Sequence, residues 1–215
     1  MRARLKQLPS LDTSGLRDCQ IDAIHGLDKS LGKDEPRALI QMATGTGKRF
    51  TACTFSWRLL KFAGARRILF PVDRNNLGDQ TLKEYQNYDP PGSGRKFDKT
   101  YIVQHLHSNR IDPDAKVVIT TIQRLYAMLR GQELDESAEE GSAFETWANE
   151  DGELPPIAYN PAIPIEMPYT KVSSDIIDPT YLGWSVRQKS IWFCSIVPTR
   201  EAKHSRAAQR IWGNI

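Results

Sequence analysis

Cysteine is scarce in this sequence of 215 residues, which contains only three. Cys19, Cys53 and Cys194 lie far apart in the chain, and no two of them form a CxxC pair. The cysteines therefore predict neither a zinc site nor a disulfide framework. A reducing compartment, the cytoplasm, is the expected location.

Long apolar runs are also missing. No stretch approaches the length that crosses a bilayer, and the N-terminal segment MRARLKQLPSLDTSGLRD lacks the apolar core of a secretory signal. Hydrophobic residues make up 40% of the chain and charged residues 26%, which is typical of a soluble globular protein. We therefore expect no membrane partner, and enough chain for one substantial domain.

Basic residues are absent from one segment. Residues 131–170 contain ten acidic residues and no Lys or Arg, whereas residues 1–130 contain 22 basic and 13 acidic residues. The excess in the first part is compatible with a polyanionic partner. On charge alone, however, ordinary scatter of charged residues over the surface is the favoured interpretation.

Short apolar runs alternate with helical stretches through the first 130 residues. This pattern predicts a parallel sheet with helices on both faces. Strands are expected at 37–42, 66–72, 100–104 and 116–121, helices at 48–63, 74–87 and 122–130, and a loop at 89–98. Gly64 is the expected end of the first helix and Gly131 of the last, and Gly78 would interrupt the second.

The rest of the chain differs in composition. Residues 131–168 are acidic and then proline-rich, with little periodicity, and predict an exposed insertion or mobile linker. Residues 169–215 form a divergent tail with one strand-like run at 190–197, SIWFCSIV, and a short helix candidate at 200–212. The expected organisation is therefore a domain over 1–130, the linker, and the tail.

The segment LIQMATGTGKRF (39–50) has most features of a phosphate-binding loop. Gly45 and Gly47 permit close backbone approach to an anion, and Lys48 supplies a positive charge where a helix begins. The strict pattern fails at Met42, which replaces the first glycine, and at Arg49, which replaces the hydroxyl that binds Mg²⁺. A glycine-rich strand-to-helix turn with an exposed lysine is an equal alternative on this segment alone.

Three further segments favour the phosphate-binding loop over the simple strand-to-helix turn. GLRDCQIDAI (15–24), RILFPVDRNNLGDQT (67–81) and VVITTIQRLYAML (117–129) flank TGTGK in the order and spacing of the motifs of superfamily 2 helicases and translocases. Over residues 8–167 the sequence most resembles the motor part of the restriction (R) subunit of type I restriction-modification enzymes. The resemblance implies an α/β fold, namely a three-layer RecA-like P-loop domain with a mostly parallel sheet.

The resemblance also implies an ATP site. Gln20 would hydrogen-bond the adenine edge with Arg17 close by, although a polar residue on an N-terminal helix is the alternative. The residues that would bind the cofactor are Arg17, Gln20, Thr44, Gly45, Thr46, Gly47 and Lys48.

A DNA-backbone site is implied as well, at the ends of two strands. Its residues would be Arg74, Asn75, Thr120, Thr121 and Gln123. Helix capping, by Asp73 or Asn75 in the first segment and by the threonines in the second, is the equal alternative. His105 and His107 lie at another strand end, where a surface role is expected.

One motif of the family is missing. A motor ATPase needs a strand that ends in an Asp-Glu pair to order Mg²⁺ and activate water. After residue 167 the sequence instead has PYTKVSSDIIDP, in which Asp175 and Asp178 favour a turn before Pro179. We therefore expect an incomplete domain, no catalytic residues, and weak or lost Mg²⁺ binding.

The chain is therefore expected to be a truncated fragment of an ATP-dependent DNA translocase, followed by a tail of unrelated sequence. By family, its partners would be double-stranded DNA and the modification and specificity subunits. The alternative is a non-catalytic P-loop module that binds nucleotide and DNA weakly or not at all. A small-molecule P-loop kinase is a distant third, because it leaves the flanking motifs unexplained. The run SIWFCSIV would either replace the missing strand or remain an aggregation-prone segment.

Overall fold

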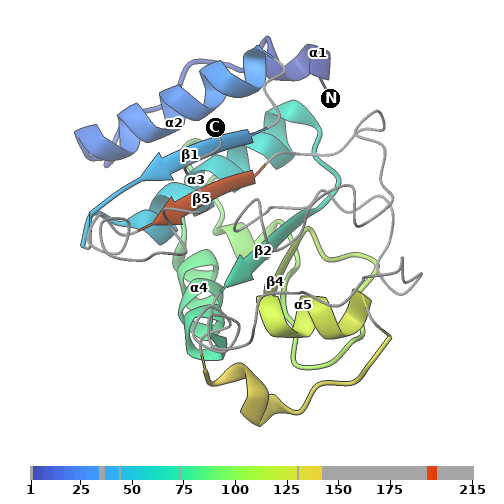
Figure 1. Cartoon of the computed structure of the whole chain (residues 1–215). Helices are drawn as coiled ribbons and strands as arrows, with labels where there is room; N and C mark the ends of the chain where they lie inside the picture. The colour runs from blue at the N-terminus through green and yellow to red at the C-terminus, as the bar shows by residue number, and fades with distance from the viewer. Residues whose placement is uncertain are drawn as a thin grey trace.

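The computed structural model describes residues 2–33, 37–43, 45–72, 74–129, 131–141 and 193–197 (Figure 1). Asp175 and Asp178, the helix expected at 200–212 and most of the expected linker lie outside these residues. Within the described part, no helix has the length and apolar character needed to cross a membrane.

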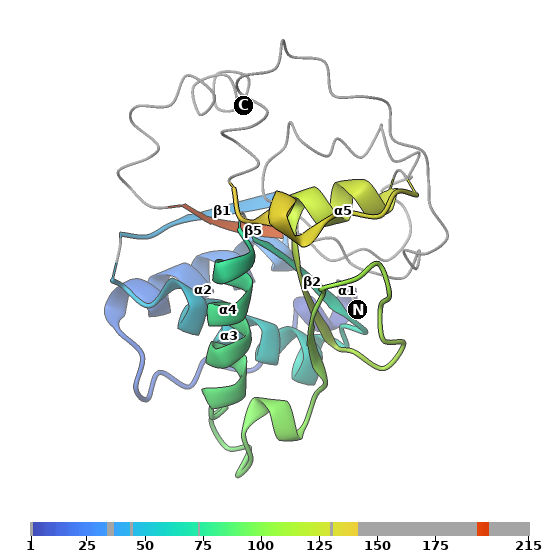
Figure 2. The same ribbon diagram turned by 90° about the horizontal axis from the view of Figure 1, so that it is seen from below.

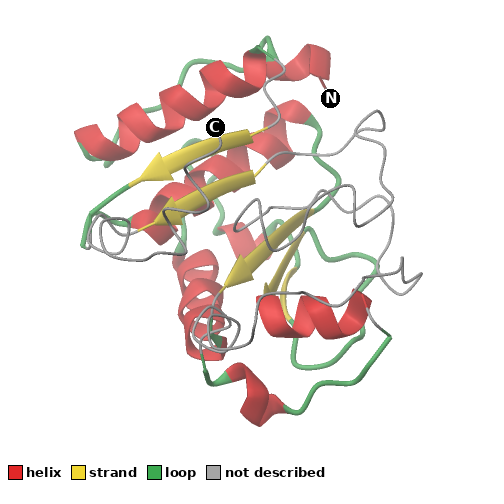
Figure 3. Ribbon diagram, viewed as in Figure 1, coloured by secondary structure: helices red, strands yellow, loops and turns green. Residues whose placement is uncertain are grey.

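The described strands pair only in parallel, as the sequence predicts (Figure 3). The central strand of the larger sheet is β4 (Val117–Thr121), which lies between β2 (Ile68–Val72) and β3 (Val103–His105). The first strand, β1 (Arg37–Gln41), pairs instead with β5 (Phe193–Val197). Residues 193–197 of the run SIWFCSIV therefore supply a partner for the strand that leads into the glycine loop.

Helices cover both faces of these strands. Figure 2 shows α5 (Ile122–Leu129) on one face and α2 (Asp18–Gly32), α3 (Lys48–Arg58) and α4 (Asn75–Asn87) on the other. Both α4 and α5 contact β4. This arrangement confirms the expected three-layer α/β fold. The remaining helical segments are α1 (Arg2–Leu5), a π-helical turn that continues α3 (Leu59–Ala63), and two 3-10 turns (Phe97–Lys99 and Glu136–Glu139).

An aromatic cluster in the core fixes the loop that follows α4. Phe97 is fully buried, and its ring centroid lies 5.0 Å from that of Tyr85 and 5.4 Å from that of Tyr101. The Tyr85 hydroxyl lies 2.7 Å from the Ser56 hydroxyl of α3, so this buried polar group has a partner. Because residues 97–99 form a 3-10 turn in this cluster, the third strand begins at Val103 rather than at residue 100 as expected.

Gly78 does not interrupt α4, which is continuous, and it lies against the His105 ring of β3. A Cβ at this position would lie closer than 3.0 Å to two atoms of that buried ring, Nε2 and Cε1. We expect Gly78→Ala to destabilise the fold by about 1–3 kcal/mol through overpacking. Gly26→Ala is the matched control: Gly26 lies within α2 with nothing within 4 Å of its Cβ, so alanine should stabilise the fold by about 0.5–1 kcal/mol. Urea unfolding of both variants measures the difference, and equal free energies of unfolding would contradict it.

Candidate nucleotide-binding site

The glycine loop connects β1 to α3, as expected from the sequence. Gly45 and Gly47 both adopt the left-handed conformation, with φ of 81° and 82°, which costs glycine little and other residues more. Between them the Thr46 hydroxyl donates to the Ala43 carbonyl at 2.7 Å. Thr44, which belongs to the expected set, lies outside the described residues. The loop therefore turns tightly into the N-terminus of α3, where backbone N–H groups favour an anion.

The beginning of α2 lies directly on this loop. Arg17 Nη1 donates to the Gly45 carbonyl at 2.9 Å, and Gln20 Nε2 donates to the carbonyls of Thr46 (3.1 Å) and Gly47 (3.3 Å). Gln20 Oε1 accepts from the Arg17 backbone N–H at 2.9 Å, so both ends of this buried carboxamide are used. The structure thus brings together the expected nucleotide residues of two segments. The contact of Gln20 with adenine stays a prediction.

Lys48 is the first residue of α3, and its side chain turns back toward the end of β1. Its Nζ donates to the carbonyls of Ala43 (3.0 Å) and Met42 (3.4 Å). The ammonium group therefore lies beside the glycine loop, on the chain that leads into it. The binding of phosphate oxygens by this ammonium group stays a prediction.

Arg49 stands where a phosphate loop has its hydroxyl. Its Nη2 donates to Gln80 Oε1 at 2.6 Å, which directs the guanidinium toward α4. The nearby hydroxyl of Thr51 donates to the carbonyl of Gly47, the N-cap residue of its own helix, at 3.1 Å. The described residues that follow Lys48 therefore do not fit a Mg²⁺ ion: they present a cation and an engaged hydroxyl rather than free oxygen ligands.

The residues expected to contact DNA gather at one edge of the larger sheet. β2 and β4 are neighbours, with Val72 opposite Thr121 at their carboxyl ends. Arg74 and Asn75, at the beginning of α4, follow β2, and Gln123 of α5 follows β4. Parallel strands thus bring the two segments together, as the rule for ligand sites in α/β sheets requires. Asp73 lies outside the described residues.

Two members of this set are not on the surface. Thr120 and Thr121 are fully buried. The Thr121 hydroxyl accepts from the Arg124 backbone N–H at 3.1 Å, the bond of a helix cap, and donates to Glu139 Oε1. The structure therefore shows capping at Thr121, and contact of either threonine with DNA stays a prediction.

Residues 131–141 fold back onto α5. Arg124 and Glu139 form a buried ion pair, in which Arg124 Nε donates to Oε1 at 3.1 Å and to Oε2 at 3.0 Å and Nη2 donates to Oε2. Gln123 Nε2 donates to the Gly141 carbonyl at 2.9 Å. Glu139 is therefore buried against α5, whereas most of the other residues of 131–141 are exposed. Glu139 is one of ten acidic residues in residues 131–170, and nothing in the sequence distinguishes it as the partner of Arg124.

The expectation of a surface role for both strand-end histidines is wrong for His105. Its side chain is only 1% exposed, and its Nδ1 lies 3.0 Å from Asp79 Oδ1 of α4. His107, by contrast, is exposed. The sequence pattern predicts that His105 lies near the end of a strand, but it does not predict that α4 covers this end.

Comparison with known proteins places the chain in a family. The family model described as type III restriction enzyme, res subunit, matches residues 13–144. The chain is 34% identical over 117 residues to the type I restriction enzyme EcoKI endonuclease subunit of Escherichia coli K12, covering 54% of this chain and 10% of that protein. It is 41% identical over 93 residues to the EcoAI endonuclease subunit of E. coli, covering 40% of this chain and 11% of that protein.

A Staphylococcus aureus relative, the type I restriction enzyme SauCOLORF180P endonuclease subunit, is 24% identical over 116 residues. The chain thus spans about a tenth of the length of the curated relatives it matches. No solved structure matches it significantly. Because the family model covers well over half of its residues, the chain belongs to the restriction-enzyme res-subunit family, and its resemblance to the restriction subunit of type I enzymes is confirmed.

Proposed function

We propose that this chain is the ATP-binding and DNA-binding beginning of the motor of a type I restriction enzyme. The observation that supports it most is the glycine loop between β1 and α3, to which Arg17 and Gln20 are bonded. Two left-handed glycines and a lysine at a helix N-terminus are the parts that hold nucleotide phosphates. Double-stranded DNA and the modification and specificity subunits would be its partners.

Phosphate binding would rest on the backbone and on one side chain. The N–H groups at the beginning of α3 would donate to phosphate oxygens, and Lys48 would exchange its bonds to Met42 and Ala43 for the charged phosphate. Arg49 offers no metal ligand in its bond to Gln80, so we expect nucleotide binding to depend little on Mg²⁺.

DNA binding would use the shared edge of β2 and β4. Arg74 is the best phosphate partner there, with Asn75 and Gln123 beside it. These side chains are partly exposed, unlike Thr120 and Thr121. We therefore propose that the backbone contact is made by the beginnings of α4 and α5, with residues 131–141 lying next to it.

Substitution of Lys48 tests the proposal. We expect Lys48→Ala to weaken ATP binding by roughly tenfold to hundredfold, because a hydrogen bond to a charged group contributes about 1.5–3 kcal/mol. Lys96→Ala removes an exposed lysine before the 3-10 turn at 97–99 and should leave the dissociation constant unchanged. Titration of a fluorescent ATP analogue measures both. No binding by the unaltered chain, or equal binding by the Lys48 variant, would contradict the proposal.

The second candidate is a P-loop module without catalysis, and Arg49 is the observation that favours it. DNA-stimulated ATP hydrolysis separates the two candidates. We expect no turnover above background from this chain. Turnover that Lys48→Ala abolishes would instead favour a working motor.

A further inference from the structure

Two histidines, His105 and His107, lie close together at the end of strand β3. His105 is its last residue, and the ladder continues one residue further, because the Leu106 N–H donates to the Ile119 carbonyl at 2.8 Å. Side chains of a strand alternate between its faces. Leu106, 1% exposed, therefore enters the core, while His105 and His107 share the other face, with their ring centroids 4.4 Å apart.

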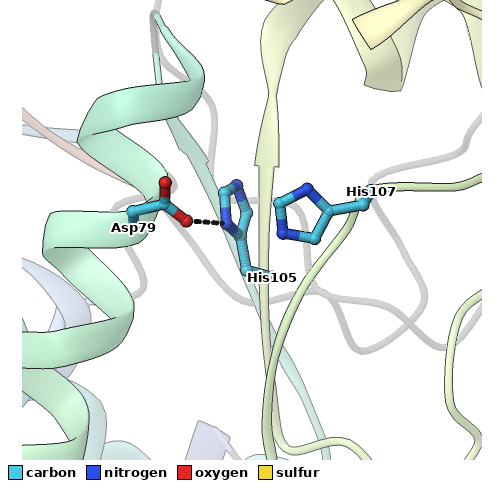
Figure 4. Close-up of side chains that lie close together, drawn as sticks. All are labelled: Asp79, His105 and His107. Atoms are coloured by element: carbon cyan, nitrogen blue, oxygen red, sulfur yellow. Dashed lines mark hydrogen bonds and ion pairs between the residues drawn. The ribbon is translucent and has the colours of Figure 1, made fainter.

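A carboxylate reaches the same place from α4. Asp79 Oδ1 lies 3.0 Å from His105 Nδ1. Figure 4 shows Asp79 and His107 on opposite sides of the His105 ring. One donor atom from each of the three residues lies within 4.8 Å of the others. Two imidazoles and one carboxylate thus converge from segments 26 residues apart in the sequence.

The His105 ring is held in place and available as a ligand. Its Nε2 is buried without a hydrogen-bond partner against Gly78, which leaves Nδ1 as the nitrogen that faces Asp79. A neutral imidazole nitrogen is the form of histidine that binds metal ions.

We propose that Asp79, His105 and His107 form a binding site for a divalent first-row transition-metal ion, for which Zn²⁺ is the appropriate probe. Imidazole nitrogen and carboxylate oxygen suit this class of ion, and three protein ligands leave a position for water. Zn²⁺ bonds of about 2.0–2.2 Å require donors closer together than 4.8 Å. Asp79 and His107 are exposed, so their side chains would move toward the ion while the buried His105 stays in place.

The bound ion would join α4 to the end of β3. It would replace the single bond between Asp79 and His105 by coordination of both, and add His107 from the following loop. This would stabilise α4, which begins at the sheet edge with Asn75 after its N-cap residue Arg74. The inference rests on the cluster alone and is independent of nucleotide or DNA binding.

Calorimetric titration of the full chain with ZnCl₂ tests the site. We expect one equivalent to bind, and His107→Ala and Asp79→Asn each to weaken binding roughly tenfold or more, since loss of even an outer-shell partner costs 10–100-fold. Both residues are exposed, so these variants should fold. His25→Ala, which removes an exposed histidine of α2, is the matched control and should bind as the unaltered chain does.

Co²⁺ in place of Zn²⁺ adds a readout that a purely structural Asp79–His105 bond would not produce. We expect visible d–d absorption on addition of Co²⁺, diminished in His107→Ala and unchanged in His25→Ala. Absence of binding by the unaltered chain would overturn the proposal. So would undiminished binding by both His107→Ala and Asp79→Asn, because the ion would then lie elsewhere.

Discussion

Glu139→Gln should destabilise the fold by about 3–5 kcal/mol, the cost of leaving a buried charge without its partner. Glu139 is fully buried and is the carboxylate that receives the Nε and Nη2 donors of Arg124 and the Thr121 hydroxyl. The glutamine keeps the shape but removes the charge. Since a domain of this kind has only about 5–15 kcal/mol of stability, the effect is a large part of the total.

Glu140→Gln is the control, because Glu140 is adjacent, acidic and exposed. Its effect should stay within about 0.5 kcal/mol. Urea unfolding, followed by circular dichroism at low temperature, measures both free energies. A Glu139 variant as stable as the control would mean that residues 131–141 do not hold α5.

A double substitution separates the ion pair from simple packing. Arg124→Met with Glu139→Leu removes both charges, and replacing a buried ion pair by apolar residues is often neutral or stabilising. We therefore expect the double variant to be more stable than Glu139→Gln alone. If the double variant is instead less stable than Glu139→Gln, the attraction within the ion pair exceeds the free-energy cost of desolvating its two charges.

This contact also shows where prediction from the sequence ends. The alternation of apolar runs and helices is a local pattern, and it predicted β1, β2, β4, α3 and α5 to within a few residues. Arg124 and Glu139 are 15 residues apart, in a helix and in an acidic segment that has no periodicity. A pairing of this kind depends on the path of the chain between them, which no local pattern specifies.

The candidate site divides in the same way. The glycine loop and the position of Lys48 at the beginning of α3 were predictable, because they belong to one continuous stretch of sequence. That Gln20 bonds the loop carbonyls, and that Arg49 reaches Gln80, depends on how α2 and α4 pack beside α3. The cluster around His105 was missed for the same reason, because Asp79 belongs to a helix that the sequence does not place over β3.

Gly47→Ala should damage the glycine loop much more than Gly45→Ala. Both glycines are left-handed, so alanine at either position costs about 1–2 kcal/mol. The difference lies in the surroundings: a Cβ on Gly47 would lie closer than 3.0 Å to Gln20 Nε2, whereas nothing lies within 4 Å of a Cβ on Gly45. Gln20 is buried and bonded at both ends of its carboxamide, so moving it breaks bonds worth about 1 kcal/mol each.

We therefore expect Gly47→Ala to lower the free energy of unfolding by about 2–4 kcal/mol and to weaken binding of the ATP analogue, with Gly45→Ala costing only about 1–2 kcal/mol. The decisive comparison adds Gln20→Ala. With the carboxamide removed, the clash disappears, and Gly47→Ala should then cost no more than Gly45→Ala does in the same background. If Gly47→Ala remains the costlier substitution without Gln20, the loop conformation does not depend on the contact with α2. An equal cost would instead show that Gln20 acts by holding the glycine loop in shape.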